Sequence, residues 1–173
     1  MTTRRRISRI NADRLAAGQP IKMLRGRKGW HLPGTPAPAL VDIHPALHLS
    51  EEAEGLRVVA DAAPCWFSAH LIHIANEGGK GNAARIRTAK MRAQGQRPGV
   101  ADYFLAVPVA SASGGSGWPG LWLELKAACG RPSDEQEQFL LRMQGAGYAC
   151  CFAYTADGAA DAMATYLSGR WPR

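Results

Sequence analysis

The sequence lacks the features of a secreted or membrane-spanning protein. Its four cysteines form no CxxC pair and occur without a secretory signal, which indicates reduced thiols and argues against a disulfide-bonded scaffold. The arginine-rich start is followed by residues 11–20, which do not form the apolar segment of a signal peptide. The most apolar stretch, residues 56–75, is interrupted by charged residues and a proline, so we expect no membrane-spanning segment. These absences predict a soluble, cytoplasmic protein.

Two common functional motifs are also absent. Residues 78–82, GGKGN, lack the P-loop pattern and its Lys-Ser/Thr pair, which argues against a nucleotide-binding loop of that kind. His44 and His48 have the spacing of one helical face, but Pro45 lies between them and the HExxH pattern is missing. We therefore interpret both histidines as ordinary residues.

The composition and the distribution of charge indicate one globular domain with a basic arm. The chain has 173 residues, of which 46% are hydrophobic and 20% charged, as in proteins that fold around a core. Residues 1–31 hold nine basic residues and one acidic residue, whereas the remainder holds twelve basic and thirteen acidic residues. We expect residues 1–45 to form a flexible basic arm and linker, and residues 46–173 to form a folded domain. Such an arm favours a polyanionic partner, and the alternative is a solvated tail.

Residue patterns predict an α/β domain. Capping residues and helix-forming segments predict helices over residues 50–63, 83–94, 133–144 and 157–167. Apolar, aromatic and β-branched segments predict strands over residues 66–76, 101–109, 121–127 and 148–154. A Ser- and Gly-rich loop joins the second and third strands, which should form an antiparallel hairpin. This order of elements predicts a mixed central β-sheet flanked by helices.

The helix predicted over residues 83–94 forms a second basic patch together with its flanks. No acidic residue occurs between Gly78 and Ala101. The basic side chains of this segment are Lys80, Arg85, Arg87, Lys90, Arg92 and Arg97. Because such side chains bind phosphates without reading bases, we expect this patch to bind a nucleic-acid backbone.

Asp102, Glu124 and Lys126 form the pattern that predicts chemistry. Glu124 and Lys126 are two residues apart on one strand and therefore project from the same face. If the neighbouring strand pairs with it, Asp102 approaches Glu124, and two such carboxylates repel unless a cation lies between them. Oxygen ligands favour Mg²⁺ or Mn²⁺, which activates water and stabilises charge on a phosphate. The pattern predicts phosphodiester hydrolysis, and the alternative is an ordinary salt-bridged strand surface.

Five segments in a fixed order carry a resemblance to a known family. They are Asn-x-Gly-Gly at 76–79, RPGxxD at 97–102, ExK at 124–126, G-R-x-S-x-x-Q at 130–136 and a Gly-Tyr strand from 147. With these segments, residues 50–167 resemble the VRR-NUC family of the PD-(D/E)xK nuclease superfamily. The resemblance implies a restriction-endonuclease-like core, in which a mixed central β-sheet is flanked by helices.

The resemblance also implies roles for individual residues. Asp102 and Glu124 correspond to metal-ligand carboxylates, and Lys126 to the catalytic lysine. Gln136 matches the catalytic-site glutamine on the helix after the active-site strand, but it is also the N3 residue of a capping box that Ser133 begins, so both roles stay open. The family supplies a further metal-binding acid from its first helix, for which spacing favours Glu54, with Glu52 as the alternative.

These interpretations predict a Mg²⁺- or Mn²⁺-dependent deoxyribonuclease. The resemblance implies an endonuclease that acts on branched or junction DNA in replication, repair or recombination, and a homodimer that brings two active sites to two strands. The alternative from a different class is a non-catalytic DNA-binding accessory module. An RNA-directed enzyme would use the same chemistry.

Overall fold

The structure is a computed structural model that describes residues 29–35, 49–75, 82–127 and 130–172. The predicted basic arm and linker therefore lie outside the described residues, except for the short segment 29–35. The Asn-x-Gly-Gly segment and Lys80 also lie outside them, and so does the side chain of Arg85.

The described residues form one mixed five-stranded sheet with the order β1-β5-β4-β3-β2. Its strands are β1 (Trp30–His31), β2 (Leu71–His73), β3 (Tyr103–Leu105), β4 (Leu121–Leu125) and β5 (Ala149–Ala153). β4 pairs in parallel with β5, and the other neighbouring strands pair antiparallel. The predicted α/β class, the mixed sheet and the antiparallel pairing of the two strands around the Ser- and Gly-rich loop are therefore confirmed.

The two central strands have the residue patterns that their positions require. In β4, Leu121, Leu123 and Leu125 are buried on one face, while Trp122 and Glu124 point to the other face. All five residues of β5 are buried, as expected for a strand with a parallel neighbour and helices on both faces of the sheet. The ExK segment therefore begins in the buried centre of the sheet.

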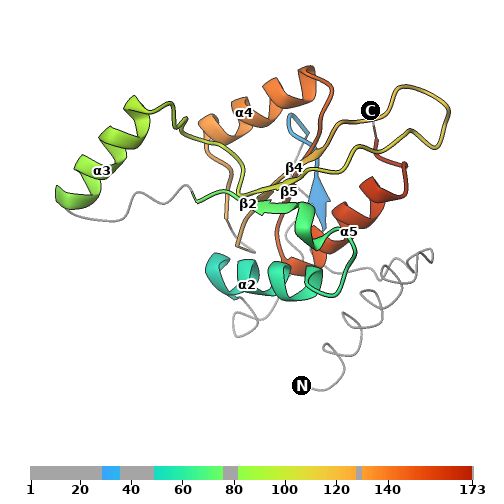
Figure 1. Ribbon diagram of the computed structural model, residues 1–173, viewed down its shortest axis with the longest axis horizontal. Helices are drawn as coiled ribbons and strands as arrows, with labels where there is room; N and C mark the ends of the chain where they lie inside the picture. Colours follow the sequence, from blue (N-terminus) through green and yellow to red (C-terminus); the bar gives the residue numbers. More distant parts are fainter. Residues whose placement is uncertain (1–28, 36–48, 76–81, 128–129, 173) are drawn as a thin grey trace.

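Among the described residues, three helices cover the sheet, and a fourth stands away from it (Figure 1). The covering helices are α2 (Glu51–Ala62) and α5 (Ala156–Leu167) on one face and α4 (Asp134–Gly145) on the other, and the separate helix is α3 (Asn82–Ala93). Ser50, Ser133 and Thr155 cap α2, α4 and α5 because their side-chain oxygens accept hydrogen bonds from backbone N–H groups of the first turn. The four predicted helices are confirmed to within about two residues at each end.

The helices of the described residues include none that is both long enough and apolar enough to cross a membrane.

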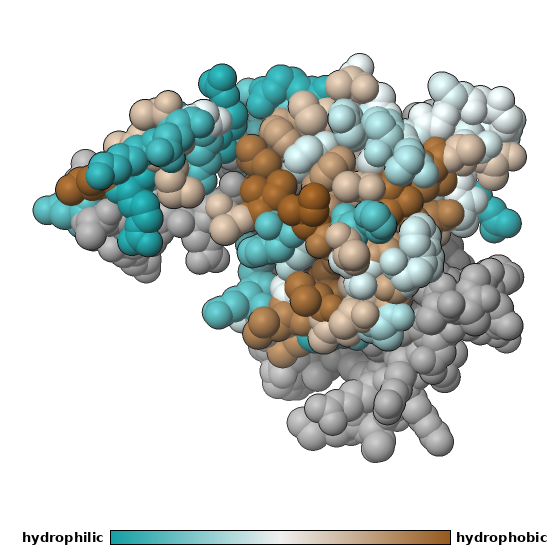
Figure 2. All heavy atoms as spheres, in the orientation of Figure 1, coloured by the Kyte–Doolittle hydropathy of each residue, from teal (hydrophilic) through white to brown (hydrophobic). Residues whose placement is uncertain are grey.

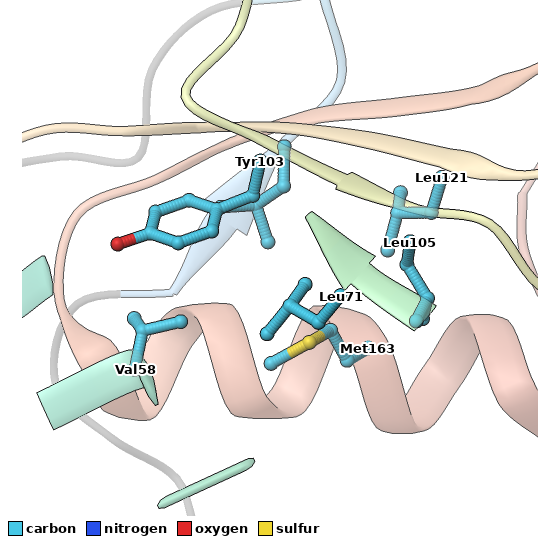
Figure 3. Close-up of a pocket in the computed structure, with 7 residues that line it drawn as sticks. Val58, Leu71, Tyr103, Leu105, Leu121 and Met163 are labelled. Atoms are coloured by element: carbon cyan, nitrogen blue, oxygen red, sulfur yellow. The ribbon is translucent and has the colours of Figure 1, made fainter. Parts of the chain in front are cut away.

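The larger of the two apolar cores lies between the sheet and the pair α2 and α5. Figure 3 shows part of this core as a pocket lined by seven side chains from both helices and three strands, which leave no room for a water molecule. Tyr103 directs its hydroxyl toward α2, where it donates a hydrogen bond to the carbonyl oxygen of Gly55 at 3.3 Å. This interior is a packed core and offers no binding site for a ligand.

Three strands differ from the sequence prediction. The strand predicted over residues 101–109 is limited to β3, Tyr103–Leu105. The strand predicted over residues 66–76 is reduced to β2, and the 3₁₀ helix Ser68–His70 precedes it. Trp30 and His31, which belong to the segment assigned to the arm and linker, instead pair with β5 as the edge strand β1. A two-residue strand is too short to show an alternating pattern in the sequence. It forms because the edge of β5 has backbone groups available for hydrogen bonding to another strand.

Candidate active site

Asp102 is held at one end of the sheet by hydrogen bonds to both neighbouring strands. β3 pairs with β4 so that Tyr103 lies opposite Leu123, and the same register continues to Asp102 opposite Glu124. The Oδ2 atom of Asp102 accepts a hydrogen bond from the backbone nitrogen of Leu125 at 3.0 Å. Its backbone oxygen accepts another from Ile74, just after β2, at 2.7 Å. The predicted approach of Asp102 to Glu124 therefore has a structural basis in strand pairing.

The turn before Asp102 packs directly against the first turn of α4. Gly99 has a φ of +75°, and a Cβ atom there would overlap the carbonyl group of Glu135 and lie 2.8 Å from the backbone nitrogen of Gln136. Glycine therefore satisfies both the left-handed backbone and the close approach at this point. This contact fixes the strand that carries Asp102 beside the helix that carries Gln136.

Glu124 is fully buried at the centre of the site. Its Oε1 atom lies 2.6 Å from the Nζ atom of Lys126 and also accepts a hydrogen bond from the side-chain amide of Gln136. Its Oε2 atom is buried and has no hydrogen-bond partner among the described residues. A buried carboxylate oxygen without a partner is costly, so this atom is the one most suited to bind an added cation.

Gln136 takes part in the predicted capping box and also contacts Glu124. Its Oε1 atom accepts a hydrogen bond from the backbone nitrogen of Ser133 at 2.9 Å, and the Ser133 hydroxyl accepts one from the backbone nitrogen of Gln136 at 3.3 Å. These two bonds complete the predicted capping box of α4. The amide nitrogen of the same side chain remains available to bind Glu124. The start of α4 and the orientation of Glu124 are therefore coupled.

The carboxylates of the site are electrostatically strained in the absence of a further cation. Burial, together with the negative charge of Asp102, raises the pKa of Glu124 to about 7, although Lys126 opposes this shift. Burial also raises the pKa of Asp102, while the Leu125 N–H group and Lys126 act to lower it. One ammonium group therefore does not neutralise the site, and a second positive charge would stabilise both ionised carboxylates.

The acid that α2 brings to this site is Glu51, where the sequence favoured Glu54. The Oε2 atom of Glu51 lies 3.9 Å from the Nζ atom of Lys126 and accepts a hydrogen bond from the backbone nitrogen of Ala127 at 3.3 Å. Glu52, the alternative, is exposed, and so is Glu51, so that exposure does not distinguish them. Spacing along the chain could not distinguish these acids, because the choice depends on how the start of α2 meets the end of β4.

Glu54 has a structural role on the opposite side of α2. Its buried Oε2 atom pairs with Arg57 at 2.9 Å and accepts a hydrogen bond from the backbone nitrogen of Ala156 at 2.9 Å. This carboxylate therefore joins α2 to the first turn of α5. Glu54 is engaged in this contact, whereas Glu51 is the acid of α2 that lies near Lys126; the assignment of Glu54 as a metal ligand stays a prediction.

Three basic residues of α3 are described as exposed, and the chain joins this helix to the site. Arg87, Lys90 and Arg92 lie exposed on α3, and Arg97 is exposed in the segment that returns to Asp102. Figure 2 shows a mostly hydrophilic surface over this helix. α3 makes few contacts with the core. Its side chains are therefore little constrained by packing and can bind a partner at the surface.

The donor set of the site suits a small, hard cation that keeps part of its water shell. The described residues contain no cluster of three or more His, Cys, Asp or Glu side chains arranged to hold a metal ion. Mg²⁺ does not need one, since it is bound by one or two carboxylates and completes its octahedron with water. Asp102 and the Oε2 atom of Glu124, which has no hydrogen-bond partner among the described residues, are the two carboxylates that could hold such an ion.

Comparisons with known proteins support the fold. No family model matches the chain, and no curated protein matches its sequence. A structure described as a VRR_NUC domain protein is similar to the chain, with a TM-score of 0.55, 16% sequence identity, and coverage of 70% of this chain and 90% of that one. At this identity the similarity concerns the fold alone. The chain therefore has a VRR-NUC-like fold.

Proposed function

We propose that the protein is a metal-dependent endonuclease that hydrolyses phosphodiester bonds in DNA. The observation that carries this proposal is the buried Glu124. Its Oε2 atom has no hydrogen-bond partner in the part of the chain that the structure describes, Lys126 lies 2.6 Å from its Oε1 atom, and Asp102 binds the backbone nitrogen of the next residue, Leu125. Because buried polar atoms generally have a hydrogen-bond partner, this Oε2 atom is suited to bind a metal ion. The VRR-NUC-like fold is consistent with this activity.

Asp102 and Glu124 are the residues that would hold Mg²⁺ or Mn²⁺, with Glu51 as the nearest further carboxylate. When bound, the ion would supply an activated water molecule and stabilise negative charge on the phosphate. Gln136 keeps Glu124 in one orientation through its amide hydrogen bond. The Lys126 ammonium lies 2.6 Å from the same carboxylate. From that position it would neutralise negative charge that develops on a phosphate bound at the site.

The nucleic acid would bind along the basic side chains of α3. Arg87, Lys90, Arg92 and Arg97 carry exposed positive charges that suit phosphates, and contacts of this kind position DNA without reading its bases. We therefore favour selectivity for DNA structure, with branched or junction DNA as the substrate class. The resemblance to VRR-NUC proteins further favours a homodimer and a role in replication, repair or recombination.

A cleavage assay tests this function directly. End-labelled duplex, flap and four-way junction DNA are incubated with the protein and Mg²⁺, Mn²⁺ or EDTA. We expect metal-dependent cleavage of at least one branched substrate, and a loss of about 10²-fold or more in Asp102→Asn and Lys126→Met. Asp161→Asn on α5 is a matched control that makes the same chemical change outside the site, and it should retain activity.

The same assay separates the two classes of function. If the wild-type protein binds these DNAs but leaves all of them intact with either metal, the non-catalytic DNA-binding module is correct. Cleavage of RNA in preference to every DNA would instead identify an RNA-directed enzyme with the same chemistry.

A further inference from the structure

His73 lies at the same end of the sheet as the candidate active site. It is the last residue of β2 and pairs with Tyr103, the residue that follows Asp102. The next residue, Ile74, donates its backbone hydrogen bond to Asp102. The strand segment that carries His73 therefore also holds the backbone of a candidate metal ligand.

The imidazole ring of His73 is exposed but supported on one side. Its centroid lies 5.2 Å from that of the Tyr103 ring, at an interplanar angle of 44°. Tyr103 is itself fixed by the hydrogen bond from its hydroxyl to Gly55. The ring is thus held against Tyr103, the residue that follows Asp102, while it remains open to solvent.

The chain around His73 connects the candidate site to the basic helix. From β2 the chain leads into α3, and from α3 it returns through Arg97 and the turn at Gly99 to Asp102. Figure 1 shows α3 extending away from the body on the side of β2. A DNA backbone that contacts both α3 and the carboxylates would have the end of β2, where His73 is exposed, within its reach.

We propose that His73 donates a hydrogen bond from its ring to a phosphate oxygen of the DNA strand next to the scissile phosphate. This inference rests on the proposed function and adds a substrate-contacting residue to it. A phosphate next to the scissile one would lie beside the carboxylates at this end of the sheet, where a hydrogen-bond donor would bind it. An imidazole carries such a donor on a short side chain, and packing on Tyr103 reduces the entropy lost on binding.

The first test compares the effect of removing His73 with the effect of removing His70, a histidine at a different position. His70 is also exposed and lies three residues earlier, in the 3₁₀ helix before β2. We expect His73→Ala to weaken binding of a fluorescent flap DNA and to raise KM by about 3- to 10-fold, the value of one hydrogen bond to a phosphate. His70→Ala should have no such effect, and His73→Asn, which retains a donor, should recover part of the loss. Equal effects of His70→Ala and His73→Ala would overturn the proposal.

The second test locates the phosphate. Single neutral methylphosphonates are placed at successive positions around the cleavage site, and DNA affinity is measured for wild type and His73→Ala with Ca²⁺ in place of Mg²⁺. If His73 contacts one phosphate, the loss caused by neutralising that phosphate is smaller in His73→Ala than in wild type, and the other positions are additive. Additive effects at all positions would show that His73 touches no phosphate, even in an enzyme that cleaves DNA. Failure of the wild type to bind or cleave DNA would instead refute the proposed function itself.

Discussion

Gln136 shows how one side chain can serve both folding and the active site. Its carbonyl oxygen completes the capping box of α4, and its amide nitrogen binds Glu124. The sequence alone presents these as alternatives, because the capping motif and the family motif share the same position. The structure combines them, since a side-chain amide has an acceptor at one end and a donor at the other.

Substitutions at the two ends of the capping box should separate these roles. Ser133→Ala removes the cap, and we expect it to lower the free energy of unfolding by about 1 kcal/mol with little effect on cleavage. Gln136→Ala also releases Glu124, and we expect an additional loss of roughly 10- to 100-fold in activity or metal affinity. Urea denaturation and cleavage rates measure the two effects. Equal loss of activity in both variants would mean that Gln136 acts through the helix cap alone.

At the scale of elements, the site depends on contacts between a turn and two helix ends. Gly99 brings the turn before β3 against the start of α4, and Glu51 brings the start of α2 to the end of β4. Each helix therefore contributes its first turn to the site, where backbone and side-chain polar groups are not consumed by the helix itself.

Gly99→Ala should disturb this arrangement more than a comparable glycine substitution elsewhere. The new methyl group would meet the backbone of Glu135 and Gln136 in addition to the strain of a positive φ. We expect a loss of about 2 kcal/mol or more in the free energy of unfolding, together with reduced cleavage. Gly114 has a φ of +83°, but a methyl group added there would meet no atom within 4 Å, so Gly114→Ala is the matched control. A loss of about 1 kcal/mol is expected there, and an equal loss at Gly99 would contradict the packing argument.

At the scale of the whole molecule, the pH dependence of stability reflects acids on both faces of the fold. Burial, together with repulsion from Asp157, raises the pKa of Asp161 from 3.8 to about 6. Asp157 is itself paired with Arg57 of α2 at 3.0 Å. A raised pKa means that the folded state holds the proton more tightly than the unfolded state. Ionisation of Asp161 therefore destabilises the folded protein. This loss of stability is absent below pH 3.8 and complete above about pH 6.

Asp161→Asn should consequently stabilise the protein at neutral pH. After a discount for the partial exposure of this side chain, we expect a gain of about 1 kcal/mol at pH 7 and almost none at about pH 3.5. Chemical denaturation at both pH values measures the difference. Glu52→Gln, at an exposed position, should stabilise at neither pH. An equal gain from Asp161→Asn at both pH values would show that the effect is not due to ionisation.

Local sequence determined the helices, their caps and the shared face of Glu124 and Lys126, because these features depend on interactions among residues close in the chain. Helix capping spans about four residues and strand alternation two, so both can be recognised without the rest of the fold. The antiparallel pairing that brings Asp102 to β4 was also predictable, since a single loop joins the two strands.

Tertiary structure alone decided which acid of α2 faces Lys126, how β1 joins the sheet and where His73 lies relative to Asp102. Glu51 and Glu54 are both acids of the first helical turn, and they are distinguished only by packing against β4 and α5. β1 depends on β5, which follows it by more than a hundred residues. Contacts over such separations are set by the packing of complete elements, which no short pattern of residues encodes.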